Sequence, residues 1–219
     1  MKPKTIVLVG ILMILAVEVH AGFLGDVLLD LTKPVAKSSD TQTTASGLKE
    51  ALTIGAGNAV GFLSKTDGYF ANQMVKILLP KQIQKVGDVL GKLGYQQQVD
   101  EFVLSMNRAA EAAAPKAKAI FMDAIAQMTF EDAMKILRGN ETAATEYLKS
   151  KTYSTLTDSF RPIISSSMNN FGVTRRYDQL IGTYTKAFPF FGAQSLDLDN
   201  YVTTEALDGL FYMIGEEER

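Results

Sequence analysis

The sequence predicts an all-α fold, a multi-helix bundle around a central Ala-rich helix pair, with a flexible N-terminal arm. Apolar residues recur at three- and four-residue spacing from residue 46 onward, which is the periodicity of amphipathic helices. No run of alternating β-branched residues is long enough to predict a strand. Residues 102–128 carry a narrow apolar stripe whose small side chains allow neighbouring helices to approach closely: Phe102, Met106, Ala109, Ala113, Ala117, Phe121, Ala124 and Met128.

Residues 1–21 have the features of a secretory signal peptide. Lys2 and Lys4 precede an apolar run over residues 5–17, and small residues at the minus-three and minus-one positions end at Ala21. The alternative is an uncleaved membrane anchor, but this run is shorter than the ~20 residues that span a bilayer. We therefore expect cleavage after Ala21, export to the periplasm and no transmembrane segment in the mature chain.

Residues 22–45 are predicted to form an N-terminal arm and linker ahead of a helical domain over residues 46–219. The arm begins with a short apolar patch, FLGDVLLDL, and continues with a polar run, KSSDTQTTAS, that is poor in core-forming residues. Ser46 is positioned to cap the first helix of the domain.

The composition excludes several kinds of chemistry. The chain has no cysteine, and its one histidine, His20, lies in the predicted signal peptide. The mature protein therefore lacks the residues of His-containing catalytic triads, of His/Cys zinc sites and of haem ligation by histidine. A net charge of −2 gives no reason to expect nucleic-acid binding. We expect no metal site and no cofactor, and we assign no catalytic residue.

The first half of the domain is predicted to contain three helices before the central stretch. In the first, over residues 46–63, three glycines predict close backbone approach to the alanine stripe: Gly55, Gly57 and Gly61. Residues 66–80 are apolar enough for a core helix after a turn at Asp67-Gly68. Residues 81–93 are amphipathic, with Leu93 facing inward and Gly94 ending the helix. Pro115 then either kinks the central stretch or begins a new helix.

The second half shows further helix boundaries. Thr129 and Asp132 have the spacing of a capping box, and Asn140 can cap the helix after it. Two more core stripes follow: Leu156, Phe160, Ile164, Met168 and Phe171, then Tyr177, Leu180, Ile181, Tyr184 and Phe188. Residues 189–192 break the pattern as a corner that is either an exposed aromatic patch or a loop tucked under the bundle.

The last helix is predicted to begin near Asp199-Asn200. Asp197 and Asp199 suggest a calcium loop, but the Gly and distal Glu of an EF-hand are missing, so helix capping is favoured. The run Glu216–Glu218 places three carboxylates at a helix C-terminus, where they oppose the helix dipole. This pattern predicts a final helix that frays or is cut there.

Six segments together resemble a bacterial secreted family, domain-of-unknown-function family 4197. They occur in order from about Gly47 to the end: GLKEAL, TDGYFANQMVKILLP, MNRAAEAAAPKAKAIF, ILRGNETAATEYL, FRPIISSSM and YVTTEALDGLF. The resemblance implies an all-helical, exported, periplasmic protein with no assigned activity. Members of the family typically continue past the glutamate run into a basic, proline-containing tail, whereas this sequence stops at Arg219.

Candidate ligand-binding residues fall in two groups and one single position. Asn107, Arg108 and Glu111 form either a binding cluster on the central helix or, for Arg108 and Glu111, an ordinary surface pair. A second group lines either a polar groove against them or a half-buried helix rim with an extended lysine: Tyr69, Asn72 and Lys76.

The single position is Arg161, which either presents its cation to an anionic ligand or pairs with a neighbouring acid.

The favoured function is non-catalytic. We expect a binding or envelope-associated protein that takes a small apolar or amphipathic ligand, or an envelope protein partner, in an apolar groove between helices. One alternative is a periplasmic enzyme with Glu111 as acid/base and Arg108 as its electrostatic partner. Another is an oligomeric structural component that pairs through an exposed C-terminal helix.

Overall fold

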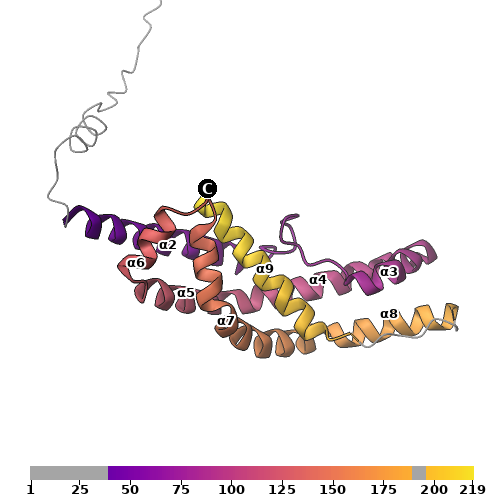
Figure 1. The fold of residues 1–219 in the computed structure, drawn as a ribbon. Coiled ribbons are helices and arrows are strands. Elements are labelled where there is room, and N and C mark those ends of the chain that lie inside the picture. The colour runs from indigo at the N-terminus through magenta and orange to yellow at the C-terminus, as the bar shows by residue number, and fades with distance from the viewer. Residues whose placement is uncertain (1–38, 189–195) are drawn as a thin grey trace, which may run out of the picture. The chain divides into compact units, whose positions relative to one another are not determined.

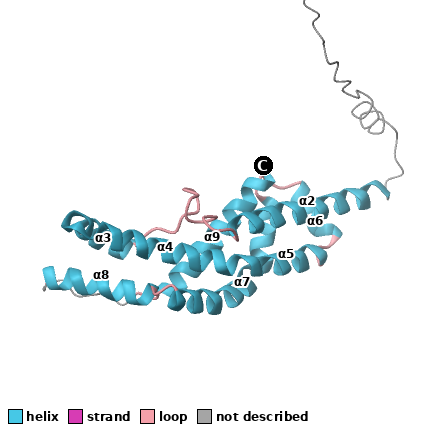
Figure 2. Ribbon diagram, turned by 180° about the vertical axis from the view of Figure 1, so that it is seen from behind, coloured by secondary structure: helices cyan, strands magenta, loops and turns pink. Residues whose placement is uncertain are grey.

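The structure, a computed structural model, describes residues 39–188 and 196–219, and in these residues it contains helices and loops but no strand (Figures 1 and 2). The predicted all-α fold is confirmed. The chain divides into two units, Met1–Asp40 and Thr41–Arg219, and the account below concerns the second. The predicted signal peptide, most of the predicted arm and the predicted corner over residues 189–192 lie outside the described residues.

From η1 to α8, the helices follow one another with short connections. A non-helical stretch over residues 64–80 separates α2 from the rest. Two of the short elements, η1 and η3, are 3₁₀ turns, and η2 is a π-helical turn. The elements are α2 (Ser39–Leu63), η1 (Lys81–Ile83), α3 (Gln84–Leu90), η2 (Gly91–Tyr95), α4 (Gln96–Ala113), η3 (Ala114–Lys116), α5 (Ala117–Ala126), α6 (Phe130–Leu137), α7 (Ala143–Asn170), α8 (Val173–Ala187) and α9 (Leu198–Glu218).

The alanine stripe lies in the core, as predicted. Apart from the half-buried Ala124, every residue of the stripe is buried. The stretch is two helices, α4 and α5, joined through η3 at Pro115, whose ring and missing N–H interrupt regular helix bonding. Both helices pack against α7, so the small side chains of the stripe face a long neighbouring helix along most of their length.

The last helix, α9, is the second centre of the fold. Buried residues occur around most of its circumference, and its main packing partner is α7 (Figure 1). The prediction of an exposed C-terminal helix is therefore wrong. A helix that is apolar on several faces is stable only inside a packed domain.

The end of α9 is held by hydrogen bonds. The Glu218 carboxylate accepts hydrogen bonds from the amides of Ala144 and Thr145, at 2.8 and 2.9 Å, and from the Thr145 hydroxyl. A carboxylate at the N-terminus of α7 satisfies unpaired amides and complements the helix dipole. The prediction that the final turn frays does not hold for Glu218, because its partners are in another helix.

Residues 64–80 contradict the prediction of a continuous helical pattern. Asp67 adopts a left-handed backbone conformation, with φ of 67°. A side chain at Gly68 would lie only 2.5 Å from the carbonyl oxygen of Phe62, so the chain turns closely back over the end of α2. Several amides of this stretch donate to side chains of α4 instead of to a helix of their own.

The first helix also differs from its prediction. It begins at Ser39, and the Ser46 hydroxyl donates to the carbonyl of Gln42 inside the helix instead of capping its start. Gly57 and Gly61 have no neighbouring element within reach of a Cβ, and Gly55 faces Glu217 of α9. The expected close approach of these three glycines to the alanine stripe is therefore wrong.

Other predicted boundaries agree with the structure. Gly94, with φ of 90°, ends the amphipathic segment, although Leu93 is exposed. Thr129 and Asp132 form a reciprocal capping box at the start of α6. Asp197 caps α9 by accepting a hydrogen bond from the amide of Asn200.

Candidate functional site

Arg108 on α4 bridges two carboxylates. Its guanidinium donates to Glu111 and to Asp67 at 2.6 Å each. Glu111 is almost completely buried, and its other carboxylate oxygen accepts from the amides of Tyr69 and Phe70, at 3.2 and 3.3 Å. Burial alone would lower the pKa of Arg108, but the hydrogen bonds to the two acids outweigh it and raise the pKa. Both oxygens of Glu111 are thus engaged by the protein.

Asn107 makes a second attachment of the same kind. Its side-chain oxygen accepts from the amide of Ile77 at 2.9 Å, and its nitrogen donates to the carbonyl of Ile77 at 2.8 Å. The nitrogen also donates to the carbonyl of Val103. Asn107 is fully buried, so these bonds replace the water that both backbone groups would otherwise need.

Tyr69 attaches the same stretch to α9. It is fully buried, and its hydroxyl donates to the carbonyl of Ala206 at 2.7 Å. Burial, with a smaller contribution from the charge of Glu111, raises the pKa of Tyr69 well above its usual range, so the hydroxyl stays protonated. The ring lies against Gly209, where an added Cβ would be 3.0 Å from it.

The remaining predicted site residues lie at the edges of this arrangement or away from it. The Asn72 side chain contacts the sulfur of Met213 at 3.5 Å. The ammonium group of Lys76 lies 3.9 Å from the centre of the Phe70 ring, a cation–π contact. Arg161 is separate from the others and pairs with the exposed Asp197 at 3.4 Å.

Together, three side chains of α4 hold residues 64–80 against the bundle. We call Asn107, Arg108 and Glu111 the polar clamp. The sequence predicted that they act together, and the structure shows their partners to be backbone groups and Asp67. This geometry favours a structural role over acid/base chemistry at Glu111. Whether the clamp also binds a ligand stays a prediction.

An apolar groove of about 440 Å³ lies between α2, α6, the start of α7 and the end of α9. These elements gather beside the C-terminus in both views (Figures 1 and 2). The floor is formed by buried apolar side chains of three helices: Leu52, Ala56, Ile136 and Ile214. The sequence did not predict the position of this groove. Those of its residues that were singled out were assigned to the apolar stripes of separate helices.

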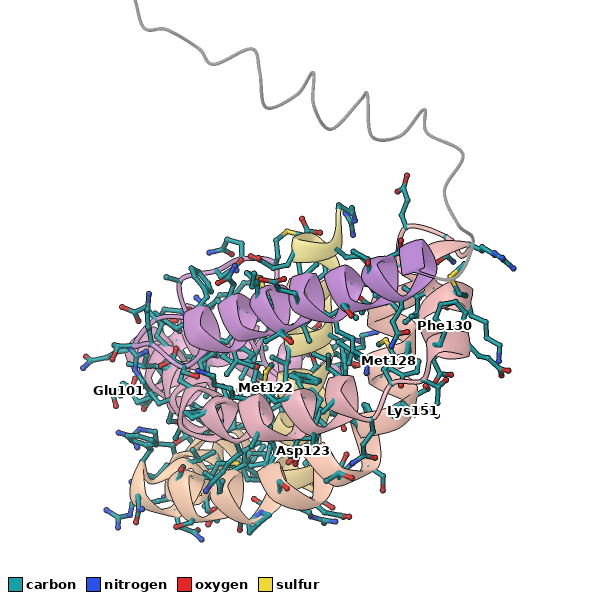
Figure 3. The ribbon with its side chains drawn as sticks, turned by 90° about the vertical axis from the view of Figure 1, so that its left-hand side faces the viewer. Glu101, Met122, Asp123, Met128, Phe130 and Lys151 are labelled. Carbon is teal, nitrogen blue, oxygen red and sulfur yellow. The ribbon has the colours of Figure 1, made fainter. Side chains whose placement is uncertain are left out.

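A polar cleft of about 420 Å³ lies between α5, the start of α6 and α7. Asp123 on α5 and Lys151 on α7 are among its lining residues, and Figure 3 shows the helices from which they project. Asp132, at the same cleft, is engaged in the capping box, which lowers its pKa. Most of the polar side chains here are exposed, so the cleft is shallow and solvated.

The described residues lack two features that would point to a membrane or a metal. None of their helices combines the length and apolarity needed to cross a bilayer. Within the same residues, no three Asp or Glu side chains lie close enough together to hold a metal ion.

Comparison with known proteins gives one match. Residues 38–219 match the family model described as a protein of unknown function, DUF4197. No curated protein and no solved structure matches the chain. The matched residues cover more than half of the sequence and include every helix from α2 to α9. The chain therefore belongs to the DUF4197 family.

Proposed function

We propose that this protein is exported to the periplasm and acts as a non-catalytic binding or envelope-associated protein for an apolar or amphipathic ligand or partner. The observation that carries the proposal is the apolar groove between α2, α6, α7 and α9. Its volume is within the range of small-molecule sites, and its floor offers buried apolar surface from three helices. An alkyl chain lying there would leave water with a gain of about 25 cal/mol per Å² of apolar area.

A pair of tryptophan variants tests the groove. Ala51 is exposed and lines the groove, so Ala51→Trp fills part of it. Thr53 is an exposed residue of the same helix, on another face and outside the groove, so Thr53→Trp is the matched control. Each variant adds the only tryptophan of the chain, which makes the two proteins comparable by fluorescence.

The experiment is native mass spectrometry of each protein purified from its own periplasm. We expect a bound small molecule on the wild-type protein and on Thr53→Trp, and loss of that mass from Ala51→Trp. A wild-type protein that carries no additional mass under gentle conditions would count against ligand binding. Retention of the ligand by Ala51→Trp would move the binding site away from the groove.

Export is tested separately. The proposal requires cleavage after Ala21, because residues 1–21 carry the charged, apolar and small-residue regions of a signal peptide. N-terminal sequencing of the protein from a periplasmic extract should begin at Gly22. A chain found only with its initiating methionine and only in the cytoplasmic fraction would contradict export.

A further inference from the structure

We propose that the groove prefers amphipathic ligands with a cationic head group, and that Glu141 is the residue that attracts the cation. This inference rests on the proposed function, because it specifies the ligand class for the same groove. It depends on two observations, the apolar floor and the distribution of charge on the rim.

The floor has no charged side chain. Leu52, Ile136 and Ile214 are each less than 10% exposed and project from α2, α6 and α9. Ala56, also buried, keeps the floor low because its side chain is a single methyl group. Such a surface gains free energy only by covering apolar atoms, so it accepts an alkyl chain without regard to the head group.

The charged residues on the rim distinguish a cationic head group from an anionic one. The charged residues that line the groove are three acids and one base: Glu141, Glu217, Glu218 and Arg219. In the part of the chain that the structure describes, Arg219 is the only basic lining residue, and its guanidinium already pairs with Glu216 at 3.0 Å.

The acids on the rim differ in what they contact. Glu218 accepts from amides at the start of α7, and Glu217 accepts from the Asn58 side chain at 2.9 Å. Glu141, just after α6, has no hydrogen-bond or ion-pair partner among the described residues, and it is exposed. Glu141 is therefore the carboxylate available to a ligand.

This charge distribution favours a cation over an anion at the mouth of the groove. At a partly solvated rim, an ammonium group in contact with a carboxylate is attracted, while a sulfate is repelled. Salt screens such an interaction, because the Debye length falls to about 3 Å in 1 M salt. The apolar contribution of the chain does not weaken in this way.

Three probes with the same twelve-carbon chain separate the two contributions. They are dodecyltrimethylammonium, dodecyl maltoside and dodecyl sulfate, each titrated below its micelle concentration and followed by isothermal calorimetry and native mass spectrometry. We expect the cationic probe to bind roughly tenfold more tightly than the neutral one, and the anionic probe to bind most weakly. In 1 M salt the difference between the probes should shrink.

The matched variants are Glu141→Gln and Glu131→Gln. Glu141→Gln should reduce the preference for the cationic probe and leave the affinity for dodecyl maltoside unchanged. Glu131 is exposed on α6 but does not line the groove, so Glu131→Gln should keep the preference.

The outcomes distinguish the two proposals. Equal affinity of the wild-type protein for all three probes, with binding lost in Ala51→Trp, would overturn the head-group preference and support the groove. No binding of any probe would contradict the groove as a site for alkyl chains, and the preference with it. A preference of undiminished size in Glu141→Gln would overturn the role of Glu141.

Discussion

At the scale of single residues, the molecule depends on polar side chains that replace missing backbone partners. Residues 64–80 have no regular secondary structure, yet Tyr69 and Ile77 in this stretch are buried. Buried backbone amides need acceptors, and α4 supplies them through Glu111 and Asn107. The polar clamp is therefore a substitute for the hydrogen bonds of a helix or a sheet.

We expect Glu111→Ala to lower the free energy of unfolding by about 2–4 kcal/mol. The substitution leaves the amides of Tyr69 and Phe70 without their acceptor and removes one partner of Arg108. Urea unfolding followed by circular dichroism measures the change. Asp67→Asn is the control, because asparagine tolerates the left-handed backbone of residue 67 and the bond of the half-exposed Asp67 to Arg108 should contribute no more than about 1 kcal/mol.

A loss below about 1 kcal/mol for Glu111→Ala would show that the clamp does not hold the stretch in place.

Asp132 predicts a dependence of stability on pH. Hydrogen bonds from the side chain and the amide of Thr129 lower the pKa of Asp132 below its ordinary value of 3.8. A lowered pKa in the folded state contributes stability that is complete above the ordinary value and is lost as the pH falls through the lowered one. Asp132→Asn should therefore be less stable than wild type at neutral pH, and the difference should disappear in acid.

Urea titrations at a series of pH values compare the two proteins. The direction of the pH effect follows from proton linkage. The Asp132 carboxylate binds a proton more readily in the unfolded state than in the capping box, so acid favours unfolding. A difference that stays constant down to the most acidic condition would contradict the role of Asp132 in the cap.

At the scale of the elements, α9 tolerates side chains only where its neighbours leave room. An added Cβ at Gly209 would lie 3.0 Å from the Tyr69 ring and 3.1 Å from Val75. Both neighbours are buried, and Tyr69 is also held by its hydroxyl, so neither can move easily. Gly209 is therefore a point of close contact between α9 and residues 64–80.

We expect Gly209→Ala to destabilise the protein by about 1–3 kcal/mol through overpacking. Gly57→Ala is the matched control in α2, since nothing lies within reach of its Cβ. Alanine is the better helix former, so Gly57→Ala should be stabilising by about 0.5–1 kcal/mol. Thermal unfolding of both variants shows whether each is more or less stable than wild type. A stabilising effect of Gly209→Ala would contradict the close contact.

The end of α9 also stabilises the start of α7. Glu218→Gln removes the charge that complements the α7 dipole and weakens the bonds to Ala144 and Thr145. We expect a loss of about 1 kcal/mol. Glu216→Gln is the control, because Glu216 pairs only with the exposed Arg219.

Hydrogen exchange should show the Glu218→Gln effect concentrated in the first turn of α7. Faster exchange spread evenly over all helices would indicate a general loss of stability and not a lost cap.

Local periodicity explains which elements could be predicted. The stripe from Phe102 to Met128 and the capping box at Thr129 depend on residues close together in the sequence, and both are found in the structure. Residues 64–80 could not be predicted in this way, because the amide of Tyr69 finds its acceptor in Glu111, 42 positions later. The apolar pattern of that stretch marked it as buried but did not identify its conformation.

At the scale of the whole molecule, burial is unevenly distributed over the described helices. In α8, only Val173 and Leu180 are buried, whereas α9 buries residues along its whole length, from Leu198 to Gly215. Local opening costs less where fewer apolar contacts must be broken. The core formed by α4, α7 and α9 should therefore be the last part to open.

Native-state hydrogen exchange measures this order. We expect amides of α8 to exchange with an opening free energy roughly 2 kcal/mol or more below that of α9. Equal protection of the two helices would show that the unit from Thr41 to Arg219 opens only as a whole.

The candidate sites also differ in how far they could be predicted from residues close together in the sequence. An apolar groove between helices was expected, but its location was not, because α2, α6, α7 and α9 contribute to it from distant parts of the sequence. The predicted site residues instead include the polar clamp, whose partners lie within the protein. Polar residues on a buried helix indicate that something is held there, but they do not distinguish a ligand from the protein's own backbone.

The position of Arg219 at the mouth of the groove has a practical consequence. Residues joined to Arg219 lie beside the groove, so an affinity tag placed there would add charge to the rim, and a bulky domain placed there would obstruct access. Binding affinities measured on such fusions would reflect the tag as well as the groove. Tag-free material, or a removable fusion, leaves the charges of Glu141, Glu217, Glu218 and Arg219 at the rim without those of a tag.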